Sequence, residues 1–152
     1  MNPDASDPAI GSSVAYADGF AVLGTVATWG GNVYSYDTRA GVSGAPERVS
    51  APESRTTMMF GFGVAVSAEW LVVSSSAGLP PTQGYAGVVD IFHRRSGKWA
   101  YFQSLRSPPG RLDKFGRSVA LRNNLLLIGA PLPDAVDGGL EHGGAVYVYS
   151  YD

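Results

Sequence analysis

The segment FGRSVA at residues 115–120 is followed by LLLIGAP at 125–131 and by GAVYVY at 144–149. The same succession occurs twice earlier: FGFGVA at 60–65 precedes WLVVS at 70–74 and GVVDIF at 87–92, and IGSSVA at 10–15 precedes FAVLG at 20–24 and GNVYSY at 31–36. In every copy the second segment begins ten residues after the first. The chain therefore contains three copies of one unit of about 50 residues.

Each segment of this unit has the apolar runs or the two-residue alternation of a β-strand, and a strand-only repeat of this length is typical of a β-propeller blade. Eleven antiparallel strands are expected, near residues 12–17, 20–26, 32–37, 46–51, 62–67, 70–75, 87–93, 99–105, 117–122, 125–129 and 144–151. The predicted fold is all-β, with a polar tail at 1–9, blades at 10–59 and 60–114, and a third blade at 115–152 that lacks its fourth strand. One chain of three blades would not close a ring, since propellers have about four to eight.

Small residues recur in the first strand of each repeat, where neighbouring backbones crowd together near a propeller axis. They are Ser13, Ala15, Gly63, Ala65, Ser118 and Ala120. In the second strands, Leu23, Val73 and Ile128 are expected to pack between blades.

The composition excludes several classes of function. A formal net charge of −2 does not favour a nucleic-acid or acidic-membrane partner, and no apolar run approaches the roughly 18 residues of a membrane span. Cysteine is absent, which excludes disulfides and thiolate metal sites. No cofactor is expected.

These segments resemble the FG-GAP repeat, the blade unit of the integrin α-subunit propeller and of many bacterial surface proteins. The third copy has both elements that characterise the family, Phe-Gly at 115–116 and Gly-Ala-Pro at 129–131, whereas the second has Ser-Ser-Ser at 74–76 and the first Gly-Thr-Val at 24–26. The resemblance covers residues 10–152. It implies binding of protein, matrix or carbohydrate, as in cell adhesion, and an extracellular or cell-surface setting, although residues 1–8 have neither part of a signal peptide.

Calcium-binding relatives have an aspartate-rich loop between the first and second strands of a blade. This chain has Asp18-Gly19, Ala68-Glu69 and residues 122–124 at those positions. None supplies the six to eight oxygen ligands that Ca²⁺ takes, so no metal site is expected.

The longer connections of a blade emerge on one face of a propeller, where recognition is expected. The candidate ligand-binding residues there are Trp29, Tyr85, Arg111, Asp113, Asp134, Asp137, Glu141 and His142. The aromatic residues suit a sugar ring or a protein partner, or else pack between blades. The polar ones form a cation or polar-ligand site without regular ligand spacing, or a solvated loop.

No nucleophile, base and orienting group occur in a recognisable arrangement, so no enzyme is expected. The basic cluster at 94–98 is expected to be a solvated hairpin.

The first hypothesis is thus a non-catalytic module that binds a protein or glycan through its longer loops. The second is structural: the open blades pair with a second chain into a six-bladed ring, or belong to a longer or mixed propeller. A propeller-type hydrolase is a third alternative.

Overall fold

The computed structural model describes residues 9–27, 30–39, 41, 44–52, 59–75, 87–108, 114–131 and 143–151. Within these ranges the chain forms eleven strands and no helix. The strands are β1 (Ile10–Ala17), β2 (Phe20–Thr25), β3 (Val33–Asp37), β4 (Glu47–Val49), β5 (Phe60–Val66), β6 (Trp70–Ser75), β7 (Val88–Arg95), β8 (Lys98–Arg106), β9 (Ser118–Arg122), β10 (Leu125–Ala130) and β11 (Ala145–Ser150). The described part of the chain contains no helix that could span a membrane.

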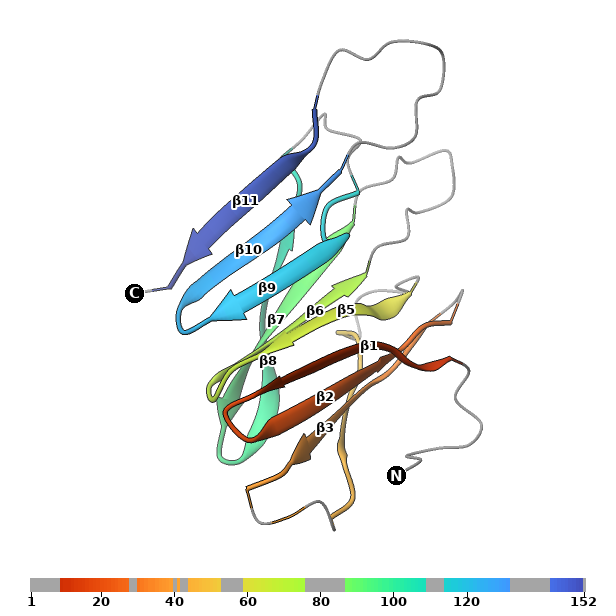
Figure 1. The fold of residues 1–152 in the computed structure, drawn as a ribbon, viewed down its shortest axis with the longest axis vertical. Helices are drawn as coiled ribbons and strands as arrows, with labels where there is room; N and C mark the ends of the chain where they lie inside the picture. The colour runs from red at the N-terminus through yellow and green to blue at the C-terminus, as the bar shows by residue number, and fades with distance from the viewer. Residues whose placement is uncertain are drawn as a thin grey trace.

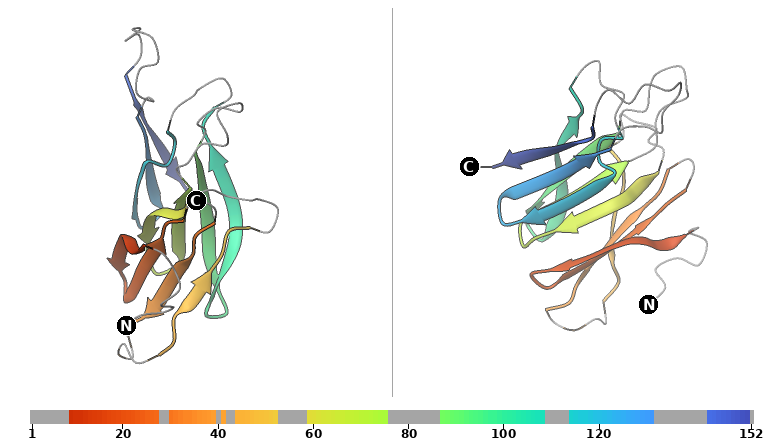
Figure 2. Two further views of the ribbon diagram at one scale, coloured as in Figure 1. Left: turned by 90° about the vertical axis from the view of Figure 1, so that its right-hand side faces the viewer. Right: turned by 45° about the horizontal axis from the view of Figure 1, so that its top comes forward.

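The strands form three antiparallel sheets, β1-β2-β3-β4, β5-β6-β7-β8 and β9-β10-β11, which are called blades 1, 2 and 3 below. Each sheet is a meander in which neighbours in sequence pair. Blade 2 lies between the other two, and the array does not close into a ring (Figures 1 and 2). The all-β fold of three propeller blades is therefore confirmed, and in the described residues blade 3 has only three strands.

Two hairpins have the same type of turn. Asp18 and Gly19, between β1 and β2, both have positive φ (51° and 80°), as do Ser96 and Gly97, between β7 and β8 (49° and 79°). Two consecutive positive φ angles are those of a type I′ turn, whose twist matches that of the flanking strands. The turns therefore set the pairing of the residues next to them, Ala17 with Phe20 and Arg95 with Lys98.

The Phe-Gly element, which is Ile-Gly in the first repeat, lies at or just before the start of the first strand of each repeat. Gly11, Gly61 and Gly116 have φ of 83°, 91° and 85°, a region that favours glycine. The strand register shifts beside two of them, between Ile10 and Ser13 and between Phe60 and Gly63, as in a β-bulge. The side chains that precede Gly61 and Gly116, Phe60 and Phe115, are fully buried.

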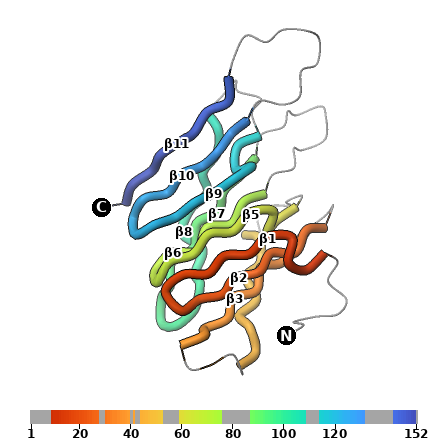
Figure 3. The backbone as a smooth tube through the Cα atoms, in the orientation of Figure 1, coloured from red at the N-terminus to blue at the C-terminus, as the bar shows by residue number. Residues whose placement is uncertain are grey.

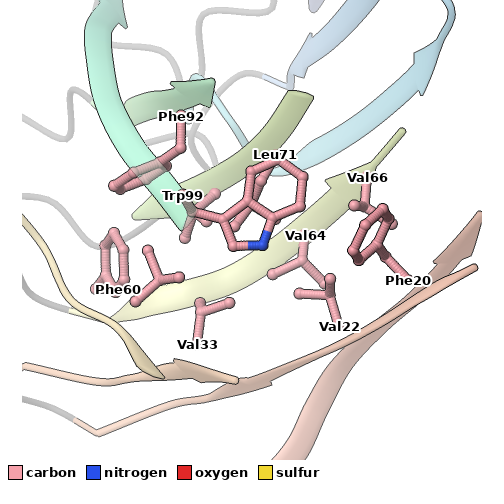
Figure 4. Close-up of a cluster of buried hydrophobic side chains, with 11 residues drawn as sticks. Phe20, Val22, Val33, Phe60, Val64, Val66, Leu71, Phe92 and Trp99 are labelled. Atoms are coloured by element: carbon pink, nitrogen blue, oxygen red, sulfur yellow. The ribbon is translucent and has the colours of Figure 1, made fainter. Parts of the chain in front are cut away.

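The core is divided into two layers, one at each junction between blades. Blade 1 contributes Phe20, Val22, Val33 and Val49 to the first layer, and blade 2 contributes Phe60, Val64, Val66, Leu71, Val73, Phe92 and Trp99 (Figure 4). In the second layer Ala65, Trp70, Val72, Val89 and Ile91 of blade 2 meet Phe115, Leu126, Ile128 and Ala130 of blade 3. Both surfaces of β6 are buried, as its continuous apolar run predicts.

The first strands lie side by side, with β5 in contact with both β1 and β9 (Figure 3). The small residues predicted there permit close approach: the hydroxyl of Ser13 donates a hydrogen bond to the Gly61 carbonyl oxygen at 2.7 Å. Val73 and Ile128 pack between blades as expected. For Leu23 the prediction is wrong: it is only half-buried and lies opposite the exposed Val14, on the surface of blade 1 that faces away from blade 2.

Candidate functional site

The eight ligand-binding residues that the sequence predicts lie outside the described residues. They are Trp29, Tyr85, Arg111, Asp113, Asp134, Asp137, Glu141 and His142. Their role as a loop-face site stays a prediction. The sites that the structure describes lie on the blades themselves.

The turn at the family's calcium position joins two blades in this chain. The Asp18 carboxylate, at the tip of the β1–β2 hairpin, accepts a hydrogen bond from the backbone N–H of Ala68 at 3.0 Å, in the corresponding hairpin of blade 2. No group of three or more acidic, histidine or cysteine side chains that could hold a metal occurs among the described residues. Asp18 therefore has a structural role between blades.

Substituting Asp18 tests that link. Asp18→Ala is expected to lower the free energy of unfolding by about 1–2 kcal/mol, because it removes one interblade hydrogen bond and places alanine at positive φ. Asp18→Asn is the control, since asparagine tolerates this backbone and keeps an acceptor oxygen; it is expected to lose less. Urea unfolding measures both, and equal midpoints for the wild type and Asp18→Ala would contradict the assignment.

A charged cluster covers the outer end of the first core layer. Arg39 binds Asp37 through its Nε (2.9 Å) and Nη2 atoms, and this hydrogen-bonded pair holds the pKa of Asp37 well below its ordinary value. The guanidinium group of Arg94 stacks 4.3 Å from the Phe20 ring centroid. The sequence predicts a solvated basic hairpin here, but Arg94 instead packs over an aromatic core residue. Because the pKa of Asp37 is lowered by folding, the stabilisation from the pair is lost as pH falls below the ordinary range of Asp.

The surface of each blade that faces the next blade is called its front face, and its members occupy the same register in all three sheets. Val22 lies opposite Ala15 and Ser35 in blade 1, Val72 opposite Ala65 and Ile91 in blade 2, and Leu127 opposite Ala120 and Val148 in blade 3. The front faces of blades 1 and 2 are covered by the blades that follow them.

The front face of blade 3 is an exposed apolar surface. Val146 is 66% exposed, Val148 61%, Leu125 44% and Leu127 37%. Their counterparts in blade 2 are Val89, Ile91, Trp70 and Val72, all of which are buried under blade 3. The sequence carries the signal for this surface in its repeat register, because the last copy keeps apolar residues where the earlier copies bury them.

The opposite end of the array has the complementary surface. On β1, Val14 is 67% exposed and Tyr16 71%, whereas their counterparts in blade 2, Val64 and Val66, are buried against blade 1. On the same surface of blade 1, Tyr34 and Tyr36 are buried. This surface, opposite the front face, is called the back face of blade 1, and its exposed part is centred on β1.

The glycines before the third strands also differ between the covered blades and blade 3. A Cβ at Gly31 would overlap the carbonyl oxygen of Phe60, and one at Gly87 would overlap that of Phe115. In both cases the Phe-Gly element of the next blade lies against the glycine before the third strand. At the equivalent Gly144, the nearest atoms belong to blade 3 itself, Cα of Pro131 at 3.0 Å and O of Ala130 at 3.1 Å.

A groove of about 90 Å³ lies between blades 2 and 3. It is on the side of β11 opposite the front face of blade 3. It is lined by Trp70, Val72, Ile91, Phe102, Gln103, Leu105, Leu121, Asn124, Leu126, Tyr149, Ser150 and Tyr151. Burial raises the pKa of Tyr149 above its ordinary value, with the neighbouring Tyr147 adding to the shift, so its phenol is neutral across the physiological range. The groove is thus an uncharged aromatic site.

Comparison with curated proteins gives no match. Among solved structures, the chain is similar to one described in "Structural and Mechanistic Analysis of Two Prolyl Endopeptidases: Role of Inter-Domain Dynamics in Catalysis and Specificity", with 15% identity and a TM-score of 0.47. That similarity covers 91% of this chain and spans 20% of the other. The FG-GAP repeat model matches residues 110–149. These residues contain β9, β10 and most of β11, and so blade 3 is the part of this chain that matches the FG-GAP repeat.

Proposed function

We propose that this chain is a non-catalytic interaction module whose propeller blades associate with further blades through their open faces. The observation that carries the proposal is the front face of blade 3, an apolar surface whose counterparts in blades 1 and 2 are covered by the blade that follows. Large exposed apolar patches of this kind commonly mark protein interaction sites.

The partner that fits is a second copy of the chain. Its blade 1 presents Val14 and Tyr16, the counterparts of the residues with which blade 2 covers blade 1. Two copies related by a twofold axis would bring each blade 3 against the other copy's blade 1. The six blades that result lie within the range of closed propellers, and twofold symmetry is the commonest among oligomers.

Light scattering across a dilution series tests the association. The expected result is a mass of twice the 15.9 kDa chain that falls toward the monomer on dilution. Val148→Asp and Val14→Asp are each expected to give monomers, since each places a charge in an apolar contact while altering an exposed side chain.

Ala100→Asp, at an exposed position of β8, is the charge-matched control and is expected to keep the dimer. A wild-type chain that remains monomeric at every concentration would overturn the second copy as partner. A dimer that survives both Val148→Asp and Val14→Asp would show that other surfaces form it.

Ligand binding through the longer loops, to a protein or a glycan, remains the prediction of the sequence for residues that the structure does not describe.

A further inference from the structure

Trp99 shows how the fourth strand of a blade seats against the preceding blade. Its ring packs edge-on against Phe20, with 5.5 Å between the ring centroids. Its indole N–H donates a hydrogen bond to the Ser35 hydroxyl at 2.9 Å, and its backbone N–H donates one to the Glu47 carboxylate at 2.8 Å. Three residues of the blade 1 front face thus make the seat for one aromatic side chain. Figure 4 shows Trp99 and Phe20 in the first core layer.

The register of the sheets identifies the same seat on blade 2. Phe20 lies opposite Asp37 and Ser35 opposite Glu47 in blade 1, while Trp70 lies opposite His93 and Ile91 opposite Gln103 in blade 2. The counterparts of Phe20, Ser35 and Glu47 are therefore Trp70, Ile91 and Gln103. All three line the groove between blades 2 and 3.

The neighbours of these residues support the correspondence. In the first junction, Phe20 is contacted by two groups of blade 2, the guanidinium of Arg94 and the ring of Trp99. Ser150 lies opposite Leu125 as His93 lies opposite Trp70, so the residues that follow them, Tyr151 and Arg94, are counterparts. The ring centroids of Tyr151 and Trp70 are 4.8 Å apart. The counterpart of Arg94 is thus present in the second junction, and the groove occupies the place that corresponds to Trp99.

The edge of β11 beside this groove has no ladder partner among the described residues, where β11 pairs only with β10. An edge strand with unpaired backbone groups can accept a further strand, and alternate side chains of an added strand enter pockets beside it. We propose that the groove binds an extended polypeptide segment with the pattern of β8, which pairs with β11 as a fourth strand and inserts an aromatic side chain between Trp70, Ile91 and Gln103.

The chemistry of the groove defines the segment. Ile91 replaces Ser35, so the inserted ring needs no hydrogen-bond donor there, and the surrounding rings of Trp70, Phe102, Tyr149 and Tyr151 favour an aromatic residue. Gln103 replaces Glu47 and retains an amide oxygen that can accept from the backbone N–H of the inserted residue. A strand with the pattern of β8 satisfies these conditions.

The probe is a fluorescein-labelled peptide with the sequence of residues 98–106, titrated with the full chain and followed by fluorescence anisotropy. Saturable binding is expected, and a Trp99→Ala version of the peptide is expected to bind at least tenfold more weakly. A scrambled peptide of the same composition should not bind. Gln103→Arg in the chain alters an exposed groove residue and is expected to weaken binding about fivefold or more.

Absence of saturable binding up to millimolar concentration, or equal binding of the scrambled or Trp99→Ala peptide, would overturn the proposal. The inference and the proposed function use different surfaces of blade 3, the groove beside β11 and the front face, and the two fail separately. Val148→Asp, on the front face, is expected to abolish the dimer and leave peptide binding unchanged. Gln103→Arg is expected to weaken peptide binding and leave the dimer unchanged.

Discussion

Replacing Trp99 with alanine is expected to lower the free energy of unfolding by about 3–5 kcal/mol, the range for deleting a large buried aromatic side chain. Trp99 is buried in the first core layer and is the one residue of β8 in that cluster. Its removal opens a cavity beside Phe20 and leaves the Ser35 hydroxyl, which is buried, without its indole donor. Urea unfolding followed by far-ultraviolet circular dichroism measures the change.

Trp99→Phe separates packing from hydrogen bonding. Phenylalanine keeps most of the edge-on contact with Phe20 but cannot donate to Ser35, so a loss of about 1–2 kcal/mol is expected. Equal losses for Trp99→Phe and Trp99→Ala would assign the whole effect to the hydrogen bond. A loss below about 1 kcal/mol for Trp99→Ala would contradict the role of Trp99 as the main contact between β8 and blade 1.

The fold could be predicted from the sequence because its signals are local and repeated. Alternation and apolar runs define the strands, so all eleven strands occur close to the expected residues. The weak fourth strand predicted at 46–51 is present but shorter, at Glu47–Val49.

The contacts between blades could not be predicted in this way. The repeat pattern places Leu23 between blades because every second strand has an apolar residue at that position, but Leu23 lies on the face of blade 1 that blade 2 does not cover. Arg94 has the pattern of a solvated cation, and its stacking over Phe20 follows from how two sheets cross. The seat of Trp99 combines residues from three strands of another blade, and sequence spacing alone carries no information on that combination.

Substituting Gly87 tests the junction between blades 2 and 3. Gly87→Ala is expected to destabilise the protein by about 3 kcal/mol, because the new methyl group would overlap the carbonyl oxygen of Phe115. The Phe115 carbonyl cannot easily move aside, because it is a backbone group and the Phe115 side chain is fully buried. The ring centroids of Phe115 and Tyr147 are 5.2 Å apart. Relief therefore requires blade 3 to move away from blade 2, which opens the second core layer.

Two other glycines supply controls for Gly87→Ala in the same urea experiment. A methyl group at Gly143 would meet no atom within 4 Å, so Gly143→Ala is expected to change stability by less than about 0.5 kcal/mol. Gly144 is the positional equivalent of Gly87, but only atoms of its own blade lie near it, so Gly144→Ala is expected to cost about 1 kcal/mol. A Gly87→Ala chain as stable as Gly143→Ala would contradict the close approach of the Phe115 carbonyl.

Gly144 also connects this prediction with the proposed association. If a second copy covers blade 3 as blade 3 covers blade 2, the start of its β1 takes the place that the Phe115 carbonyl has beside Gly87. Gly144→Ala would then place a methyl group where the partner's backbone must approach. It is expected to shift the monomer–dimer equilibrium in light scattering toward the monomer, whereas Gly143→Ala leaves it unchanged. The same position in the repeat thus affects folding at the covered junction and association at the open one.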